Sequence, residues 1–237
     1  MRTKNDDIIK CIADRLVRWF DVNGRRFPWR FISDPYKILI TELLLQRTKA
    51  ETIEKIYDKF FNRFPNIGAL AKADIAELKK IFSKLGLSYR AQRAKKVAEE
   101  LMRIYGGKIP CNMYDLLKLK GIGVYIASAT LNFGFNKPTP VVDKNVMRVL
   151  NRLRGITNEK SARIFVKKLF NYGDNQKIAY ALIDLGSLIC VENPKCTLCP
   201  LKGICHKIPL KKEKWRFMRK IIGKDGMIRL REQPTSK

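Results

Sequence analysis

Two carboxylates occupy positions that favour acid–base chemistry, and the first is Glu42. It lies in the segment 35–48, which is apolar around most of a helical circumference. Burial disfavours the charged form of a carboxyl group, so its pKa rises toward the range that a general acid requires. The alternative is a structural role, in which Glu42 pairs with Arg30 or Arg47.

The second carboxylate, Asp143, follows Val141 and Val142 and precedes an apolar helical pattern that starts at Val146. This position predicts an N-cap, which is a structural role. A helix N-terminus also keeps a carboxylate ionised, ready to stabilise a developing cation. Together Asp143 and Glu42 resemble the paired carboxyls of glycoside hydrolysis, in which one protonates and the other stays anionic beside an oxocarbenium-like sugar.

Four cysteines within sixteen residues suggest a metal centre. Their pattern is C-x5-C-x2-C-x5-C, at Cys190, Cys196, Cys199 and Cys205. A single CxxC flanked closely on both sides differs from the two separated CxxC pairs of a zinc ribbon. The spacing therefore favours a [4Fe–4S] cluster, with zinc as the alternative. We expect this loop to be structural and to expose lysines to a phosphate backbone.

A glycine-containing turn, Gly121-Ile122-Gly123, connects two apolar helical patterns and follows Lys118 and Lys120. Glycines permit positive φ and let backbone N–H groups at the next helix approach a phosphate closely. This is the helix-hairpin-helix arrangement, which binds DNA without reading its sequence. The alternative is a sharp turn with no ligand.

The overall charge indicates a polyanionic partner. The 237 residues include 49 Lys and Arg against 22 Asp and Glu, which gives a formal charge of +27. Such a surplus favours nucleic acid, because basic side chains release counterions from phosphates. The one histidine, His206, excludes HExxH metalloproteases and two-His zinc fingers.

The chemistry-bearing residues must be positioned by helices. Amphipathic helical spacing recurs from Ile8 onward, strand signals are nearly absent before residue 215, and 46% of residues are hydrophobic, so we predict an all-α fold with a real core. No apolar run is long enough for a membrane span or a secretory signal. We therefore expect a soluble, intracellular protein of the cytoplasm, associated with the nucleoid and not with membranes. The basic stretch 209–237 has two alternatives, a solvated tail or a DNA contact, with a small hairpin at Asp225-Gly226.

Three motifs in order along the chain support a family resemblance. The glycine turn, the Val-Val-Asp that ends at Asp143 and the four-cysteine loop resemble the helix-hairpin-helix DNA glycosylases of the endonuclease III and MutY superfamily, over most of residues 8–206. Four further segments resemble the MutY branch and the related archaeal thymine-DNA mismatch glycosylases, namely 27–30, 34–36, 42–48 and 143–150. The resemblance implies two all-α lobes, with the substrate base flipped into the cleft between them.

The same resemblance implies a division of the chain. Residues 1–28 would form the N-terminal helix of the cluster lobe, and residues 29–135 a six-helix module that contains the hairpin. Residues 136–208 would complete the cluster lobe, with the catalytic Asp and a [4Fe–4S] loop, before the basic tail at 209–237.

Catalytic roles also follow from the resemblance. Asp143 matches the catalytic aspartate, Glu42 the general acid of the MutY branch, and Asn145 a polar residue near the scissile sugar. Tyr125 stands where bifunctional members carry a Schiff-base lysine. Because a tyrosine cannot form an imine, we predict base removal without β-elimination. The alternatives are that Tyr125 is a core aromatic and that nearby lysines give weak lyase activity.

The resemblance places three further residues against DNA. Base flipping leaves a gap that a side chain must fill. Leu87 is the candidate wedge, and Gln46 the candidate contact to the estranged base, with Arg47 beside it. The alternatives are a core leucine and ordinary surface polar residues.

Two departures from the family pattern bear on cofactor and substrate. The first cysteine gap is five residues where the family usually has six, which puts cluster occupancy in question. Only 29 residues follow Ile208, whereas MutY adenine glycosylases carry a long C-terminal domain that reads 8-oxoguanine. We therefore predict a monomeric, monofunctional glycosylase that removes thymine or uracil opposite guanine from double-stranded DNA in base-excision repair. The alternatives are a minimal adenine glycosylase, an endonuclease III-like lyase and a non-catalytic DNA-structure binder.

Overall fold

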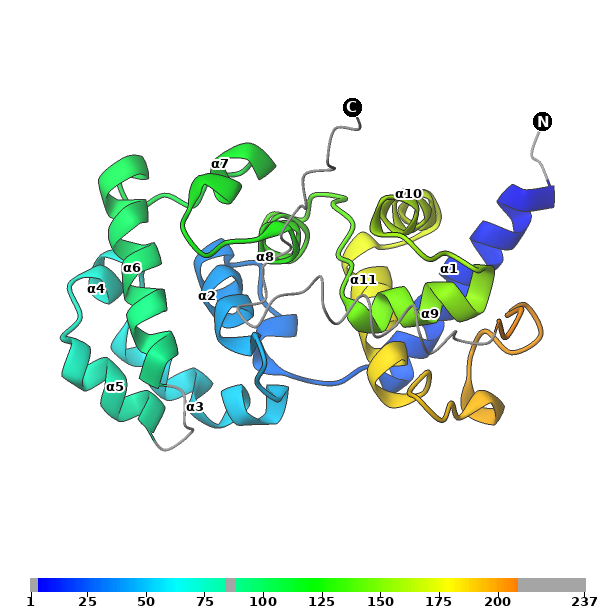
Figure 1. Ribbon diagram of the computed structural model, residues 1–237, viewed down its shortest axis with the longest axis horizontal. Coiled ribbons are helices and arrows are strands. Elements are labelled where there is room, and N and C mark those ends of the chain that lie inside the picture. The colour runs from blue at the N-terminus through cyan, green and yellow to red at the C-terminus, as the bar shows by residue number, and fades with distance from the viewer. Residues whose placement is uncertain (1–3, 84–87, 209–237) are drawn as a thin grey trace, which may run out of the picture.

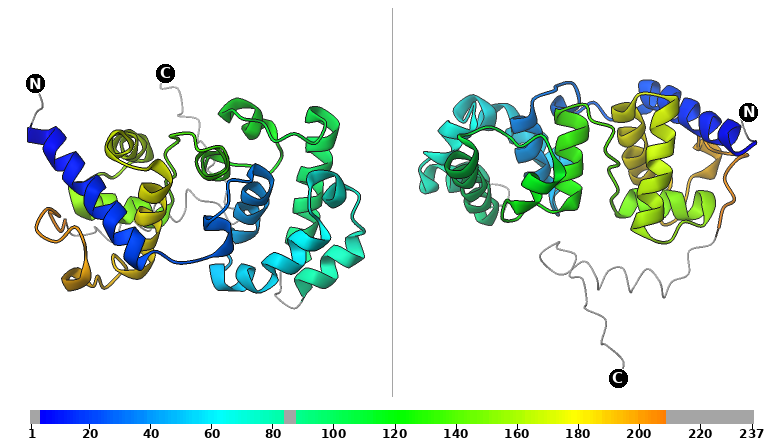
Figure 2. Two further views of the ribbon diagram at one scale, coloured as in Figure 1. Left: turned by 180° about the vertical axis from the view of Figure 1, so that it is seen from behind. Right: turned by 90° about the horizontal axis from the view of Figure 1, so that it is seen from above.

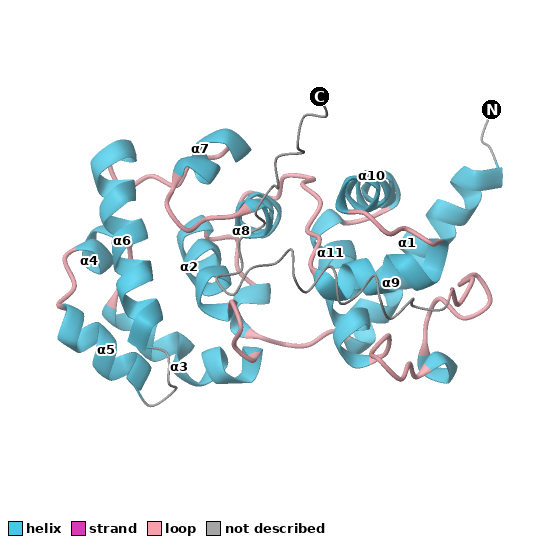
Figure 3. Cartoon of the chain, in the orientation of Figure 1, coloured by secondary structure: helices cyan, strands magenta, loops and turns pink. Residues whose placement is uncertain are grey.

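The computed structural model describes residues 4–83 and 88–208. Within these ranges the regular structure is helical and no strand occurs (Figure 3), which confirms the predicted all-α class. The helices gather in two lobes, and the views of Figures 1 and 2 agree on this arrangement. None of the described helices is long and apolar enough to cross a membrane. The predicted wedge Leu87 and the tail 209–237, with its predicted hairpin, lie outside the described residues.

The first lobe follows the middle of the chain. Its helices are α2 (Pro35–Leu45), α3 (Ala50–Arg63), α4 (Ile67–Ala71), α5 (Ile75–Ser83), α6 (Ser88–Tyr105), α7 (Met113–Lys118) and α8 (Val124–Ala129), between a 3-10 turn η1 (Pro28–Arg30) and a π-helical segment η2 (Thr130–Gly134). The described part of this lobe thus has seven α-helical segments, one more than the six expected. The additional segment is the short α4, which stands as a separate turn because the side chain of Asn66 caps its N-terminus.

The second lobe joins the two ends of the described chain. It consists of α1 (Lys4–Asn23), α9 (Lys144–Arg154), α10 (Glu159–Leu169) and α11 (Asn175–Leu188), with short 3-10 turns η3 (Phe170–Tyr172) and η4 (Cys196–Leu198). The amphipathic helix α1 packs its apolar face on α10 and α11. Residues from the beginning and the end of the described chain therefore share one core.

The boundary between the two hydrophobic cores falls within a few residues of Asp143. Val141 is buried in the core of the first lobe, and Val142 in the core of the second. Helix α11 likewise contributes Tyr180 to the first core and the adjacent Ala181 to the second. The candidate catalytic residues thus lie where both cores end.

Contacts between α11 and the π-helical segment join the lobes at this boundary. The rings of Phe133 and Tyr180 stack with centroids 3.8 Å apart. The Gln176 side-chain amide donates to the carbonyls of Asn132 and Phe133 at 3.1 and 3.2 Å. These bonds satisfy carbonyl groups within η2, where the regular α-helical pattern is interrupted.

Candidate active site

Glu42 is presented by a helix that is buried on nearly all sides. Helix α2 begins at Pro35, and the preceding Asp34 caps it by accepting the N–H groups of Tyr36 and Lys37. Only 5% of Glu42 is exposed, as its apolar surroundings in the sequence predict. Burial raises the pKa of Glu42 to about 7, although the positive charge of Arg30 lowers it.

Tyr125 and Asp143 meet Glu42 in the space between the lobes. Tyr125, on α8, lies near enough for its hydroxyl group to lower the pKa of the Glu42 carboxyl. Asp143 lies near enough for its negative charge to raise the pKa of Glu42 further. Three residues from α2, α8 and the start of α9, singled out separately in the sequence, therefore form one cluster.

Asp143 caps α9 as predicted. Its Oδ1 accepts the backbone N–H groups of Asn145 at 2.9 Å and Val146 at 2.8 Å, and its Oδ2 accepts the Asn145 side-chain amide at 3.0 Å. Burial nevertheless raises the pKa of Asp143 above its ordinary value, because desolvation outweighs these hydrogen bonds and the charge of Arg148. Our expectation considered only the helix N-terminus and omitted this desolvation.

Arg148 connects this cluster to the cysteine loop. One of its guanidinium nitrogens donates to Asn145 Oδ1 at 3.0 Å, and its Nε donates to the carbonyl of Cys190 at 2.7 Å. It also hydrogen bonds the carbonyl of Gly186 on α11. Asn145 is therefore held between Asp143 and Arg148, which fixes the orientation of its amide.

A buried ion pair borders the other side of Glu42. Arg30 donates to both carboxylate oxygens of Asp184, at 2.5 and 2.7 Å, and Arg25 donates to the same carboxylate. The guanidinium of Arg30 also lies over the ring of Tyr180, 4.5 Å from its centroid. The alternative that Arg30 is the ion-pair partner of Glu42 is thus replaced by a pair with Asp184.

The hairpin has the backbone geometry that its glycines predict. Gly121 has a φ of +92°, and Gly123 is the N-cap of α8. Lys120 is exposed, whereas the ammonium group of Lys118 is 3.1 Å from Asp115 and lies over the ring of Tyr114. The turn therefore exposes Lys120, beside Lys118, which has a carboxylate partner in Asp115.

Gln46 and Arg47 end α2 at the surface. Gln46 is the C-cap, and Arg47 has a φ of +58°, which is uncommon for a residue with a side chain. The Gln46 side-chain oxygen accepts from Arg93 at 2.5 Å. This short segment thus joins the hairpin through α6, because Arg93 also hydrogen bonds the carbonyl of Gly121.

The four loop cysteines are partly buried thiols, and N–H donors lie near two of the sulfurs. Arg152 lies 3.4 Å from Cys190 Sγ, and the Lys207 N–H lies 3.4 Å from Cys205 Sγ. The charges of the other three loop thiols act on the pKa of Cys199, so the four sulfurs are gathered together. Within residues 4–83 and 88–208, however, no three His, Cys, Asp or Glu side chains are arranged to hold a metal ion.

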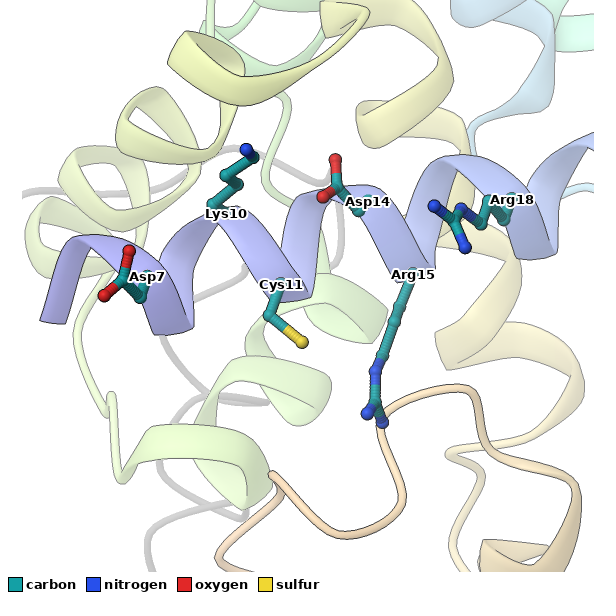
Figure 4. Close-up of a pocket in the computed structure, with 6 residues that line it drawn as sticks. All are labelled: Asp7, Lys10, Cys11, Asp14, Arg15 and Arg18. Atoms are coloured by element: carbon teal, nitrogen blue, oxygen red, sulfur yellow. The ribbon is translucent and has the colours of Figure 1, made fainter. Parts of the chain in front are cut away.

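Helix α1 anchors the cysteine loop from outside. Figure 4 shows Arg15 extending from α1 toward the loop, where it donates to the carbonyls of Pro200 at 3.3 Å and Lys202 at 3.1 Å. Cys11 also lies on α1, where it lines a surface pocket together with charged residues of the same helix.

Sequence reasoning did not identify Asp184, Arg148 or Gly186. Asp184 carried a usable signal, because it is a single acid within the apolar run of α11, as Glu42 is within α2. Arg148 and Gly186 carried no such signal, because their roles depend on residues far away in the sequence. Arg148 hydrogen bonds the carbonyls of Cys190 and Gly186, which lie 42 and 38 positions further along the chain.

The chain is similar to known DNA glycosylases over most of its length. The chain is 35% identical to a thymine-DNA glycosylase of Aeropyrum pernix, over 83% of this chain and 94% of that protein. It is 37% identical to an adenine DNA glycosylase of Buchnera aphidicola, over 80% of this chain and 56% of that protein. The solved structure of a thermostable thymine-DNA glycosylase superposes with a TM-score of 0.80 at 33% identity, over 86% of this chain and 97% of that one. Residues 40–172 match the HhH-GPD superfamily of base excision DNA repair proteins, and the chain belongs to this family.

Proposed function

We propose that the protein is a monofunctional DNA glycosylase that hydrolyses the N-glycosidic bond of thymine or uracil opposite guanine and so initiates base-excision repair. The observation that carries the chemistry is the cluster of Glu42, Tyr125 and Asp143, in which a carboxyl of pKa about 7 lies beside a second, capped carboxyl. The similarity to thymine-DNA glycosylases over nearly their whole length supports the choice of base.

The two carboxyls have different roles in this proposal. Asp143 stabilises the oxocarbenium-like sugar and helps to place the attacking water, and Asn145 holds it in position. Glu42, protonated near neutral pH, donates its proton to the departing base. Tyr125 orients Glu42 through its hydroxyl group and lines the base pocket.

The absence of an amine at position 125 supports hydrolysis without strand cleavage. A phenol forms no imine with the sugar, so the covalent intermediate of a lyase does not arise at Tyr125. The side chains of Lys120 and Lys144 are exposed. Borohydride trapping on a substrate duplex tests this point, because a lyase would become covalently attached to the DNA.

DNA contacts are proposed on the hairpin and on the loop after α2. The turn at Gly121 and Gly123 brings backbone N–H groups to a phosphate, with Lys118 and Lys120 beside it. Gln46 and Arg47 contact the estranged base, and Leu87 fills the gap left by the flipped base. The positive charge of the chain supports this surface.

Cys190, Cys196, Cys199 and Cys205 would hold a [4Fe–4S] cluster. Four thiolates close together are the ligands of such a cluster. The charges of the loop thiols act on the pKa values of Cys199 and Cys205, so the four sulfurs lie near one another. N–H donors at the sulfurs stabilise cluster-bound thiolates. The cluster would fix the loop that Arg148 and Arg152 contact.

The deciding experiment incubates the protein with end-labelled duplexes containing T·G, U·G, A·8-oxoguanine or thymine glycol, with and without alkali. We expect strand breaks at T·G and U·G only after alkali. The Asp143→Asn variant should lose excision and keep its DNA affinity. Cleavage of A opposite 8-oxoguanine would instead indicate an adenine glycosylase, the second candidate that the Buchnera similarity favours.

A further inference from the structure

Three arginines meet where the hairpin, α6 and the loop after α2 converge. Arg90 donates to the hydroxyl group of Thr48. Arg93, one turn further along α6, donates to the side-chain oxygen of Gln46 and to the carbonyl of Gly121. We call Arg47, Arg90 and Arg93 the arginine cradle.

The charges in the cradle are concentrated and partly desolvated. Burial lowers the pKa of Arg90, and the positive charges of Arg47 and Arg93 lower it further. The oxygens that Arg90 and Arg93 contact belong to a hydroxyl, an amide and a carbonyl, all of them neutral. Like charges that lie close together in a partly desolvated site repel one another. A bound anion would offset this unfavourable free energy.

A nearby carboxylate has another partner. Glu100, two turns beyond Arg93 on α6, accepts the backbone N–H of Lys120 at 2.8 Å. It therefore braces the hairpin and is not hydrogen bonded to either α6 arginine of the cradle.

The hydrogen bonds of Arg90 and Arg93 within residues 4–83 and 88–208 leave N–H donors available for a ligand. A guanidinium group has five N–H donors, and the contacts described above use one from Arg90 and two from Arg93. The remaining donors suit the oxygens of a phosphate, which arginine binds through two parallel hydrogen bonds. Gly121 permits this arrangement, because a Cβ at its position would lie 2.7 Å from Arg93 Nε.

We propose that the arginine cradle binds a backbone phosphate of DNA beside the hairpin, and that Arg93 simultaneously positions Gln46. This proposal rests on the DNA-binding function of the family and adds Arg90 and Arg93, which the sequence did not indicate. One contact would thus fix both the hairpin and the segment that faces the estranged base.

The test compares Arg90→Gln and Arg93→Gln in the full chain with a matched control, Arg103→Gln. Arg103 is an exposed arginine in the last turn of the same helix, so the control removes the same charge from α6. Binding to a mismatched duplex is measured by fluorescence anisotropy over a series of salt concentrations. We expect each cradle variant to bind more weakly and to reduce the slope of log K against log salt concentration by about 1. Arg103→Gln should leave that slope nearly unchanged.

Methylphosphonate duplexes, which replace one charged phosphate at a time with a neutral linkage, locate the contact. At the phosphate bound by the cradle, the replacement should weaken binding of the native protein and have little further effect on Arg90→Gln. Arg90 carries the test even if Arg93→Gln does not fold, since Arg90 hydrogen bonds a side-chain hydroxyl, that of Thr48, and not the backbone of the hairpin.

Two results would overturn the proposal. The first is weaker DNA binding by both variants with an unchanged slope of log K against log salt concentration. It would mean that the arginines only support the hairpin and the loop after α2. Equal effects from Arg90→Gln and Arg103→Gln, with no phosphate position that distinguishes them, would indicate general attraction to DNA without a specific site. If either result is obtained while both variants still excise T·G at low salt, the cradle alone is rejected and the proposed glycosylase function stands.

Discussion

Gly186 leaves the space into which the backbone of Asn145 packs. A Cβ on Gly186 would lie 2.7 Å from the Cβ of Asn145 and 2.9 Å from its carbonyl oxygen. Helix α11 therefore approaches the first turn of α9 as closely as two backbones allow. This contact sets the position of Asn145, whose amide in turn holds Asp143.

Replacement of Gly186 by alanine should displace the start of α9. Because small displacements of catalytic groups are costly, we expect the single-turnover rate of excision to fall by about 10²-fold while DNA affinity is retained. Gly68→Ala on α4 is the matched control, since its nearest neighbour is the Asn66 side chain at 3.3 Å. An unchanged rate for Gly186→Ala would show that α9 does not depend on this contact.

The acid role of Glu42 predicts a particular pH dependence. Because its pKa is about 7, Glu42 is protonated below that pH, and the excision rate should fall as the pH rises above it. In Glu42→Gln this decrease of the rate above pH 7 should disappear, and the excision rate should drop by about 10²–10⁴-fold. Single-turnover kinetics across the pH range measure both effects. A rate that rises through neutral pH would indicate that Glu42 acts as a base on the attacking water.

The same carboxyl should make stability depend on pH. Folding raises the pKa of Glu42 from its ordinary 4.5 to about 7, so the folded state binds more protons between these values. Stability should therefore decline as the pH rises through this window. Between about pH 5 and pH 8, the free energy of unfolding of Glu42→Gln should increase by up to about 3 kcal/mol relative to that of the native chain. Urea unfolding at both pH values measures the difference in stability between the variant and the native chain. The same difference at both values would contradict the pKa that burial gives Glu42.

The ion pair between Arg30 and Asp184 should be important for stability. Asp184→Asn leaves two arginines facing a neutral amide in a buried site, and we expect a loss of about 3–5 kcal/mol. Asp21→Asn breaks the exposed pair with Lys177 and should cost less than about 1 kcal/mol. Thermal and urea unfolding compare the two. Similar small losses would mean that water reaches Asp184.

The proposed cluster predicts a selective dependence of iron on the loop cysteines. Cys199→Ala should lower iron content and the visible absorbance of the purified protein, since three thiolates hold a cluster less firmly than four. Cys111→Ala, an exposed thiol outside the loop, should leave both unchanged. Zinc in the native protein in place of iron would reject the cluster.

Local pattern was sufficient for much of the fold and for the central pair of carboxyls. The helical class follows from amphipathic spacing, the burial of Glu42 from its apolar neighbours, and the cap at Asp143 from the helical pattern after it. Each of these properties depends on residues within about two helical turns.

Features that depend on distant residues were not predictable in this way. The partner of Arg30 is 154 positions away in Asp184, and the salt bridge forms only because α11 packs against the first lobe as well as within the second. The π-helical segment at Thr130–Gly134 has no local signature in the sequence and reflects packing against α2 and α11. The desolvation that raises the pKa of Asp143 likewise arises only when the lobes meet.

The position of α1 has a consequence for synthesis of the chain. Its apolar residues, among them Ile12 and Leu16, belong to a core whose other members begin at Val142. As the chain leaves the ribosome, α1 emerges before the other described helices, while its packing partners are among the last described residues to be made. The first lobe, residues 27–141, has nearly all of its core within one continuous stretch. We therefore expect the first lobe to form on the ribosome, whereas α1 packs only after α9–α11 have been made. Asp143 can join Glu42 and Tyr125 only at that stage.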